Sequence, residues 1–419
     1  MTAPVSPRGG IRLFGFAVAG LGAFTLTASS SAPSPLYPVY QQMWGFSAAV
    51  LTVVFAAYVL ALLAALVTVG ALSDHVGRKP VVIVSLLALT VSMLVFIAAE
   101  DAGWLIVARV IQGAAMGTAT GALSAAVIEF QPGPRIGPLI NTTGPSLGLA
   151  LGAACAGLLV QYAPFPTVLV YALIAVLALG LAVAAFFVPE TSPSVGFESW
   201  RQALRSLLPS ASVPREVRAP FLLVLPSLVS AWALSGIYMS LGPSLMESVF
   251  GIDNRLAGGL IIGSLFTAGT VAAVLSTRRA PYEVVVVGGM FLTVGLAMVI
   301  TGLGVEQVVL YYLGTVIAGF GWGATFLGAM NVIGALGAPA ERSRIFATTY
   351  VVCYLAFSVP AMIAGVAAGA FGLTATAVGY GTIVASVALG SGVVLWFRRP
   401  VTPSRMQKVP EPISAAGTS

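Results

Sequence analysis

The chain has 419 residues, of which 58% are hydrophobic and only 8% are charged, whereas soluble domains carry roughly 25% charged residues. A soluble fold would expose a very large apolar surface to water, so the composition excludes one. The net charge of +6 does not indicate a nucleic-acid partner, because the basic residues lie between apolar stretches and form no patch interleaved with aromatic side chains.

The first apolar stretch has the pattern of a signal peptide. Arg8 and Arg12 precede an apolar run over 13–26, and small residues follow it (TASSSA), as in a cleaved secretory leader. Cleavage would leave an odd number of apolar stretches. The internal repeat of the chain favours an even number, so we expect this stretch to remain as the first helix.

Twelve apolar stretches are long enough to cross a bilayer, which takes about 20 helical residues. They are predicted at 13–31, 48–71, 80–98, 104–129, 138–160, 166–188, 220–245, 256–276, 283–303, 307–336, 345–369 and 374–396. The polar segment 190–219 separates the first six stretches from the last six. We therefore predict an all-α integral membrane protein of two six-helix bundles, over 1–189 and 220–397, with a cytoplasmic linker at 190–219 and a cytoplasmic tail at 398–419.

Basic residues give the expected orientation. With the N-terminus in the cytoplasm, all but two of the 19 lysines and arginines fall in cytoplasmic segments. The exceptions are Arg255, which lies outside, and Arg109, which lies within a helix. Because cytoplasmic loops are enriched in these residues, we expect a multi-pass protein of the cell membrane with both termini in the cytoplasm.

The two halves resemble each other. The fourth stretch reads VIQGAAMGTATGA over 110–122, and the tenth reads VIAGFGWGATFLG over 316–328. A shift of 206 residues superimposes Gly113 on Gly319 and Gly117 on Gly323. Parallel six-helix repeats are a known plan for transporters that rock around a central site. We therefore predict a pseudo-twofold axis along the membrane normal.

The loop after the second stretch reads GALSDHVGRKP over 70–80. It resembles the signature loop of the major facilitator superfamily, G-x-x-x-D-R-x-G-R-[RK], with His75 in place of the usual arginine. The matching residues are Gly70, Asp74, Gly77, Arg78 and Lys79. RVIQG (109–113), GPSLG (144–148, with Leu149 in place of a final glycine) and VPET (188–191) follow in the family's order. The chain resembles the twelve-helix drug/metabolite:proton antiporters.

This resemblance implies that the loop is a conformational latch that breaks and reforms as the halves rock, formed by Gly70, Asp74, His75, Gly77, Arg78 and Lys79. In physical terms, Gly77 permits a tight turn. Asp74 lies at a helix C-terminus, where the dipole disfavours negative charge, so it needs a cationic or helix-N-terminal partner. The alternative is a loop that only caps the helix and directs insertion.

Arg109 is the only charge clearly inside a predicted span. It lies five residues beyond Trp104, roughly 7–8 Å below the outer surface at about 1.5 Å per residue. A charge buried in a membrane costs several kcal/mol unless it is paired, and such residues usually face a cavity. Arg109 and Gln112 are therefore candidates for contacting substrate, and the resemblance favours proton movement. The alternative is an arginine that snorkels outward to Glu100 or Asp101.

Small residues indicate close helix packing. Gly113, Gly117 and Gly121 recur every four residues in the fourth span, which lets helix backbones approach closely. Gly144, Pro145 and Gly148 predict a close-packed, bent fifth helix. Cys155 and Cys353, far apart in apolar stretches, are expected to be small packing residues and not a disulfide pair.

Polar and aromatic residues near the middle of the predicted spans are candidates for lining a central substrate cavity: Tyr58, Trp232, Tyr238, Trp322, Phe326 and Tyr354. None of the carboxylates lies mid-span. Because exporters of cationic drugs are expected to keep an acid in the membrane, the sequence favours a neutral or anionic, fairly apolar substrate.

We therefore expect a monomeric, proton-coupled efflux transporter that works by alternating access, with uptake by symport or uniport as the alternative. A membrane enzyme or receptor is disfavoured, since the chain has no cluster of His, Asp or Cys and no extramembrane domain. No cofactor is expected. The single histidine excludes a zinc site built from several imidazoles, and the absence of a G-x-x-x-x-G-K-[ST] loop excludes ATP hydrolysis.

Overall fold

A computed structural model of the chain describes residues 9–68, 76–192, 212–337 and 339–398. All regular elements in these ranges are helices. The first half contains α1 (Gly9–Ser31), η1 (Ser34–Leu36), α2 (Tyr37–Trp44), α3 (Ala48–Thr68), α5 (Arg78–Ile97), α6 (Ala102–Phe130), α7 (Ile136–Tyr162) and α8 (Pro166–Phe186). The second half contains η2 (Arg215–Val217), α10 (Arg218–Phe250), α11 (Arg255–Ser276), α12 (Pro281–Gly304), α13 (Val308–Gly334), α14 (Pro339–Phe371) and α15 (Leu373–Phe397).

The described residues include 12 helical segments that are long and apolar enough to cross a membrane. This confirms the predicted all-α membrane fold with twelve spans. One segment was not predicted to be helical: the segment after Ser31, which has the prolines of a loop, forms η1 and α2 and extends the first span to Trp44. The linker predicted over 190–219 lies partly outside the described residues, and its last residues already form η2 and the start of α10.

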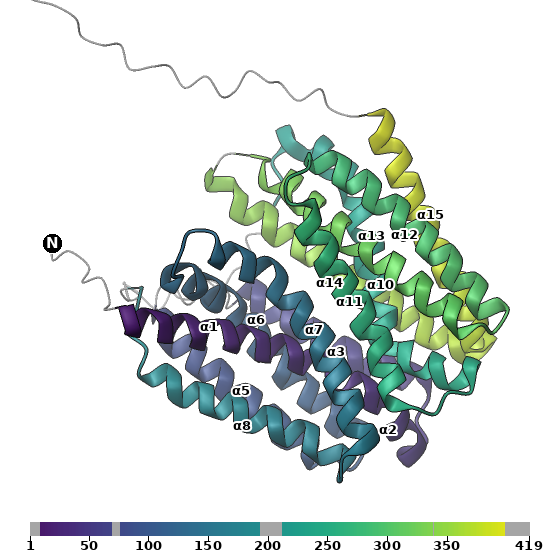
Figure 1. Cartoon of the computed structure of the whole chain (residues 1–419), viewed down its shortest axis with the longest axis horizontal. Coiled ribbons are helices and arrows are strands. Elements are labelled where there is room, and N and C mark those ends of the chain that lie inside the picture. Colours follow the sequence, from purple (N-terminus) through teal and green to yellow (C-terminus); the bar gives the residue numbers. More distant parts are fainter. Residues whose placement is uncertain (1–8, 69–75, 193–211, 338, 399–419) are drawn as a thin grey trace, which may run out of the picture.

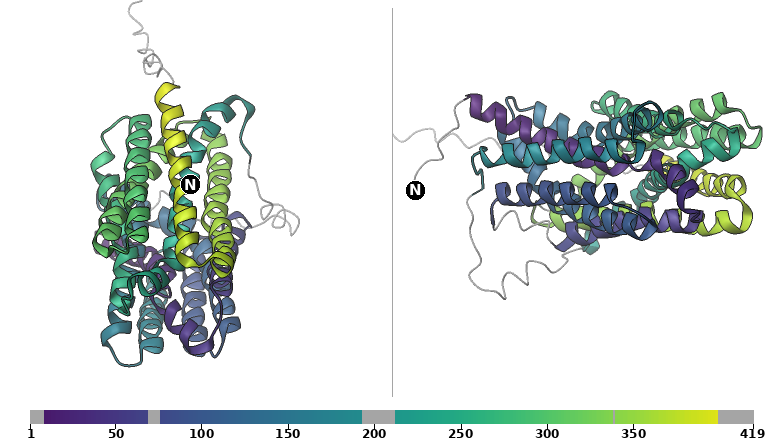
Figure 2. Two further views of the ribbon diagram at one scale, coloured as in Figure 1. Left: turned by 90° about the vertical axis from the view of Figure 1, so that its right-hand side faces the viewer. Right: turned by 90° about the horizontal axis from the view of Figure 1, so that it is seen from below.

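The helices of the two halves form two bundles, coloured purple to teal and green to yellow (Figure 1, and from other directions in Figure 2). Between the bundles, α3 packs on α14 and α7 packs on α11. The 206-residue shift carries α3 onto α11 and α7 onto α14. The contact of α3 with α14 is therefore the counterpart of the contact of α11 with α7. A twofold relation requires such reciprocal contacts.

Close helix packing is repeated inside the two bundles. A Cβ atom at Gly113 of α6 would overlap the carbonyl oxygen of Tyr58 in α3. At the equivalent position in α13, a Cβ atom at Gly319 would overlap the carbonyl oxygen of Leu265 in α11. Backbones approach this closely only where a side chain is absent. The internal repeat in the sequence is therefore a repeat of helix–helix contacts.

We name the two ends of the molecule by the chain segments they contain. The terminal face holds the start of α1, the loop 131–135 and the end of α15. The opposite face holds α2 and the connections at 98–101, 251–254 and 305–307. The halves are in close contact at the opposite face, where a Cβ atom at Gly259 of α11 would overlap the carbonyl oxygen of Ala153 in α7.

Candidate functional site

The side chain of Arg109 is fully buried in the first half, with no exposed surface. Its Nη1 donates to the carbonyl oxygen of Ser30 and to Oε1 of Gln112, each at 2.8 Å. Its Nε donates to the hydroxyl oxygen of Tyr37 at 3.0 Å, and Nη2 donates to the same oxygen. Gln112 donates from Nε2 to the carbonyl oxygen of Ser29 at 2.8 Å. The guanidinium thus joins α6 to the C-terminal end of α1 and to the N-terminal end of α2.

Aromatic rings surround the same guanidinium. Its central carbon lies 5.3 Å from the ring centroid of Tyr58, 5.6 Å from that of Tyr37 and 6.0 Å from that of Phe96. Rings at such distances stabilise a cation through their quadrupole. Tyr58, predicted to line the cavity, therefore lies against Arg109.

The acceptors for Arg109 and Gln112 are available because α1 ends at Ser31. In a continuous helix the carbonyl oxygen of Ser29 would bond the backbone nitrogen of residue 33, but Pro33 has no N–H. Gln112 donates to that oxygen instead. The segment equivalent to this break in the second half lies within α10, which is continuous from Arg218 to Phe250. The arrangement is therefore specific to the first half.

Neither Glu100 nor Asp101 pairs with Arg109, so the alternative of an outward-snorkelling arginine is wrong. Asp101 is the N-cap of α6, and its carboxylate accepts from the backbone nitrogen of Gly103 at 2.7 Å. The charge of Arg109 faces the C-terminal end of α1, where a helix carries about half a negative charge. The fixed positive charge is therefore only partly offset.

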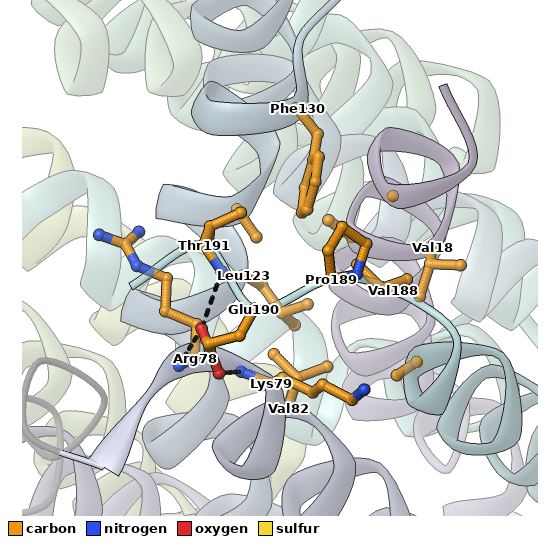
Figure 3. Close-up of a pocket in the computed structure, with 14 residues that line it drawn as sticks. Val18, Arg78, Lys79, Val82, Leu123, Phe130, Val188, Pro189, Glu190 and Thr191 are labelled. Carbon is orange, nitrogen blue, oxygen red and sulfur yellow. Dashed lines mark hydrogen bonds between the residues drawn. The ribbon is translucent and has the colours of Figure 1, made fainter. Parts of the chain in front are cut away.

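The loop motif contributes a second cluster at the terminal face. Gly70, Asp74 and His75 lie outside the described residues. The carboxylate of Glu190 accepts from the backbone nitrogens of Arg78 and Lys79, each at 3.0 Å (Figure 3). It therefore caps the N-terminus of α5, where the helix dipole favours an anion.

The side chains of this motif hold neighbouring helices. Arg78 forms a 2.9 Å ion pair with Glu129 of α6, and Lys79 donates from Nζ to the carbonyl oxygen of Phe186 in α8. Both contacts stay within the first half. Together with Glu190 and apolar side chains such as Phe130, Arg78 and Lys79 line a cavity of about 30 Å³ (Figure 3), which is large enough for water but not for a substrate.

Gly77 is required by this geometry. Its φ of +95° is a conformation that L-residues rarely adopt, and a Cβ atom there would lie 2.6 Å from Oε2 of Glu190. The glycine thus permits both the turn and the close approach of the capping carboxylate.

The predicted cavity residues separate into three places, the first of which is that of Tyr58 beside Arg109. Trp232, Trp322, Phe326 and Tyr354 belong to an aromatic cluster of the second half, in which Trp232 packs edge-on against Phe326 and Tyr354 at 6.0 and 5.0 Å and Trp322 stacks on Phe326 at 5.9 Å. Phe357 continues this cluster to Phe55 of the first half at 5.0 Å. We call these six residues the aromatic cluster.

Tyr238 lies elsewhere. It is buried inside the second half, where its hydroxyl shares a 2.7 Å hydrogen bond with Thr315 and its ring stacks on Tyr311. It is therefore a core residue in this conformation.

Only some of the glycines predicted to pack closely lie against a neighbouring helix. Gly113 and Gly117 face α3, and Gly148 faces α1, where a Cβ atom would overlap the side chain of Thr27. Gly121 is exposed, and the nearest atom to a Cβ at Gly144 would be Ile140 of the same helix, 3.8 Å away. Pro145 is exposed within the continuous helix α7.

Polar side chains join the halves at the opposite face. Gln42 of α2 donates from Nε2 to Glu247 of α10 at 2.5 Å, and its Oε1 accepts from Arg255 at 3.4 Å. Arg255 forms a 2.7 Å ion pair with Glu247, and its backbone nitrogen donates to Oε1 of Gln161 at 2.7 Å. We call Gln42, Glu247 and Arg255 the opposite-face clamp. A cleft of about 420 Å³ adjoins it and is lined in part by Gln42 and Glu247.

Residues 19–360 match the sequence profile of the Major Facilitator Superfamily. The chain belongs to this superfamily. It is 25% identical over 372 residues to the multi-drug resistance efflux pump PmrA of Streptococcus pneumoniae, covering 85% of this chain and 89% of the pump.

Two solved structures share the fold. The nucleoside transporter NupG, solved as a mutant, superposes with a TM-score of 0.69 at 13% identity, over 92% of this chain and 99% of that chain. The human organic anion transporter MFSD10 (TETRAN) superposes with a TM-score of 0.62 at 18% identity, over 93% and 100%. The chain is therefore a membrane transporter of the Major Facilitator Superfamily, and not an enzyme.

Several contacts of this superfamily member escaped prediction from sequence. Tyr37 was missed because its proline-rich surroundings indicate a loop. Glu190 was recognised only as part of a motif, although an acid at a helix boundary is a signal for capping a helix N-terminus. Glu247 and Arg255 lie close in sequence on either side of the connection between α10 and α11, but nothing local to them indicates Gln42 as a partner.

Proposed function

We propose that this transporter exports a small, apolar, neutral or anionic molecule by alternating access, in exchange for protons. The observation that carries the proposal is the buried guanidinium of Arg109, whose described hydrogen bonds go to carbonyl, amide and hydroxyl oxygens and to no carboxylate. The C-terminal end of α1, which carries about half a negative charge, offsets this charge only in part. The remaining positive potential repels a cation strongly in a low dielectric and attracts an anion or a polarised carbonyl.

Similarity to a multi-drug efflux pump over most of the chain supports export as the direction. The substrate class and the coupling to protons are proposed by analogy with such pumps and with the expectation from the sequence motifs. The likeness to the nucleoside and organic anion transporters concerns the fold alone, at 13% and 18% identity.

We propose that the terminal face is cytoplasmic and that the halves, over 1–189 and 220–397, move as units in a monomer of the cell membrane. Described basic residues gather at the terminal face, among them Arg78, Arg135, Arg279 and Arg398, whereas Arg255 lies at the opposite face. The positive-inside rule then supports cytoplasmic termini. In this orientation the opposite-face clamp closes the extracellular side.

We propose that Gly70, Asp74, His75, Gly77, Arg78 and Lys79 act as the latch. The contacts of Arg78 with Glu129 and of Glu190 with the start of α5 fix one side of it. Nε and Nη1 of Arg78 have no hydrogen-bond partner among the described residues, so the guanidinium retains donors for a further acceptor.

Transport by purified protein in proteoliposomes tests the proposal. A pH gradient is imposed in either direction, and the movement of matched cationic, neutral and anionic analogues is measured with and without a protonophore. We expect neutral and anionic analogues to move against the proton flux and to stop when the gradient is dissipated. Preference for the cation would contradict the assigned role of Arg109, and accumulation in the direction of the proton flux would indicate uptake.

A further inference from the structure

Two indole N–H groups in the aromatic cluster lack partners. Nε1 of Trp232 and Nε1 of Trp322 are buried and have no hydrogen-bond acceptor among the described residues. A buried donor left unpaired costs about 1–3 kcal/mol, and native proteins leave few such groups. Two of them within one cluster, each ring in contact with Phe326, require an explanation.

Other buried aromatic side chains of the surrounding half do have hydrogen-bond partners. Tyr380 donates to the carbonyl oxygen of Ala233 at 2.7 Å, and Tyr312 donates to that of Ala257 at 2.6 Å. Acceptors are therefore within reach of buried donors in this half. A third unpartnered group, the hydroxyl of Thr325, faces Gly288 of α12 and is separate from the indole pair.

The indole group has a restricted chemistry. Its N–H donates and cannot accept, so only a molecule with an acceptor atom can satisfy it. The rings around it offer apolar faces and edges, which favour stacking or edge-on contact with a planar body. The cluster also links the halves, since Phe357 of α14 contacts Phe55 of α3. Movement of the halves therefore changes the space around it.

We propose that the transported molecule is planar, usually aromatic, and carries an acceptor oxygen that the indole N–H groups of Trp232 and Trp322 bind. This inference rests on the proposed function and specifies its substrate class. In the conformation described, both donors are buried and unpaired, which raises the free energy of that state. A substrate that satisfies them stabilises the conformation in which the cluster is open, so that binding favours the conformational change.

Four probes that share one ring test the inference: benzoate, acetophenone, ethylbenzene and benzyltrimethylammonium. Equilibrium binding to proteoliposomes is measured and corrected with empty liposomes for partition into lipid. We expect benzoate and acetophenone to bind at least about 10-fold more tightly than ethylbenzene, because ethylbenzene has no acceptor for the two donors.

Variants then assign the preference to the two indoles. Trp232→Phe and Trp322→Phe keep an aromatic ring but remove the N–H, and each should weaken binding of benzoate and acetophenone about 3- to 10-fold while leaving ethylbenzene unchanged. Trp104→Phe, at an indole that is 42% exposed, is the matched control and should change nothing. If a phenylalanine variant fails to fold, benzothienylalanine at the same position removes the N–H and preserves the shape.

The outcomes separate the inference from the proposed function. An equal loss for all probes, or no loss for the acceptor-bearing ones, would show that the indoles only pack and would overturn the inference. If proton-driven transport persists in that case, the proposed function stands. If acceptor preference is found but transport ignores the pH gradient, the inference stands and proton coupling does not.

Discussion

Arg109 donates from two nitrogens to a single acceptor, the hydroxyl oxygen of Tyr37. At the equivalent position of the second half, Thr315 shares a hydrogen bond with the hydroxyl of Tyr238. Both halves thus bond their fourth span to a tyrosine of their first span, but only the first half does so with a charge. The two tyrosines are not equivalent, because the 206-residue shift carries Tyr37 onto Pro243, so each half forms its own version of this bond.

The charge of Arg109 should determine which analogues are transported. Arg109→Met removes the charge at similar length, and we expect the discrimination against a cationic analogue to fall at least about 10-fold, since the repulsion in low dielectric is lost. Arg109→Lys keeps the charge without the planar fork and should retain discrimination at a lower rate. Proteoliposome transport, normalised to folded protein, measures both.

The control for this prediction is Tyr37→Phe, which removes the shared acceptor and leaves the charge. It should lower the temperature of unfolding, because two buried donors lose their partner, and it should leave charge discrimination in place. Unchanged discrimination in Arg109→Met would show that another group selects the substrate.

Replacement of Gly77 should destabilise the protein more than its backbone conformation alone explains. Gly372 precedes α15 with φ +82° and ψ 158°, close to the φ +95° and ψ 156° of Gly77, but a Cβ there would meet no atom within 4 Å. Gly77→Ala should therefore lower the unfolding temperature beyond Gly372→Ala, because it also displaces Glu190. Equal shifts, measured by thermal unfolding in detergent, would mean that Glu190 moves aside freely.

Loss of the carboxylate in the opposite-face clamp should open that face. In Glu247→Gln the ion pair with Arg255 is lost, and a partly buried charge pair contributes more than an exposed one. We expect a larger fraction of molecules with a long distance between spin labels at Ser47 and Ala370, which lie at the opposite-face ends of α3 and α14. Glu100→Gln, at an exposed acid of the same face, should leave the distribution unchanged; equal distributions for both variants would contradict the prediction.

A bulky side chain at Gly259 should prevent closure of the opposite face. Valine there would overlap the backbone of α7 at Ala153, so the variant should fold in an open conformation but fail to transport. Gly180→Val is the control, because a Cβ at Gly180 meets no atom within 4 Å. Normal transport by Gly259→Val would show that α7 and α11 can separate without cost.

Asp74→Asn should impair transport while leaving expression and membrane insertion largely intact, because the latch proposed above would be a switch contact and not a packing contact. Parallel loss of folded protein and of transport would instead indicate a capping role. His75→Arg tests a further effect: imidazole titrates near pH 6.5, so the wild type should show a dependence on the pH of the side proposed to be cytoplasmic, and the variant should lack it. Identical pH profiles would exclude a titrating latch.

The length of the apolar stretches was sufficient to predict twelve spans, because a bilayer sets the length of a span. The spacing of glycines was sufficient to predict the repeat, because helices in lipid pack closely through small residues. Arg109 could be recognised from sequence as a buried charge. Its partners could not, since Pro33 frees a carbonyl of α1 only once α1 and α6 are adjacent in space. The capping of α5 by Glu190 joins residues more than a hundred positions apart, and no local pattern specifies which helix end an acid will meet.

The helix α2 has eight residues and spans about 12 Å. Its first residue, Tyr37, is held by Arg109, and near its other end Gln42 is held by Glu247 of the second half. Because α2 contacts both groups, we expect a shift of the guanidinium to move the extracellular closure proposed above. In the second half the equivalent segment lies within the single helix α10, so we expect this coupling in the first half and not in the second, although the two halves share one fold.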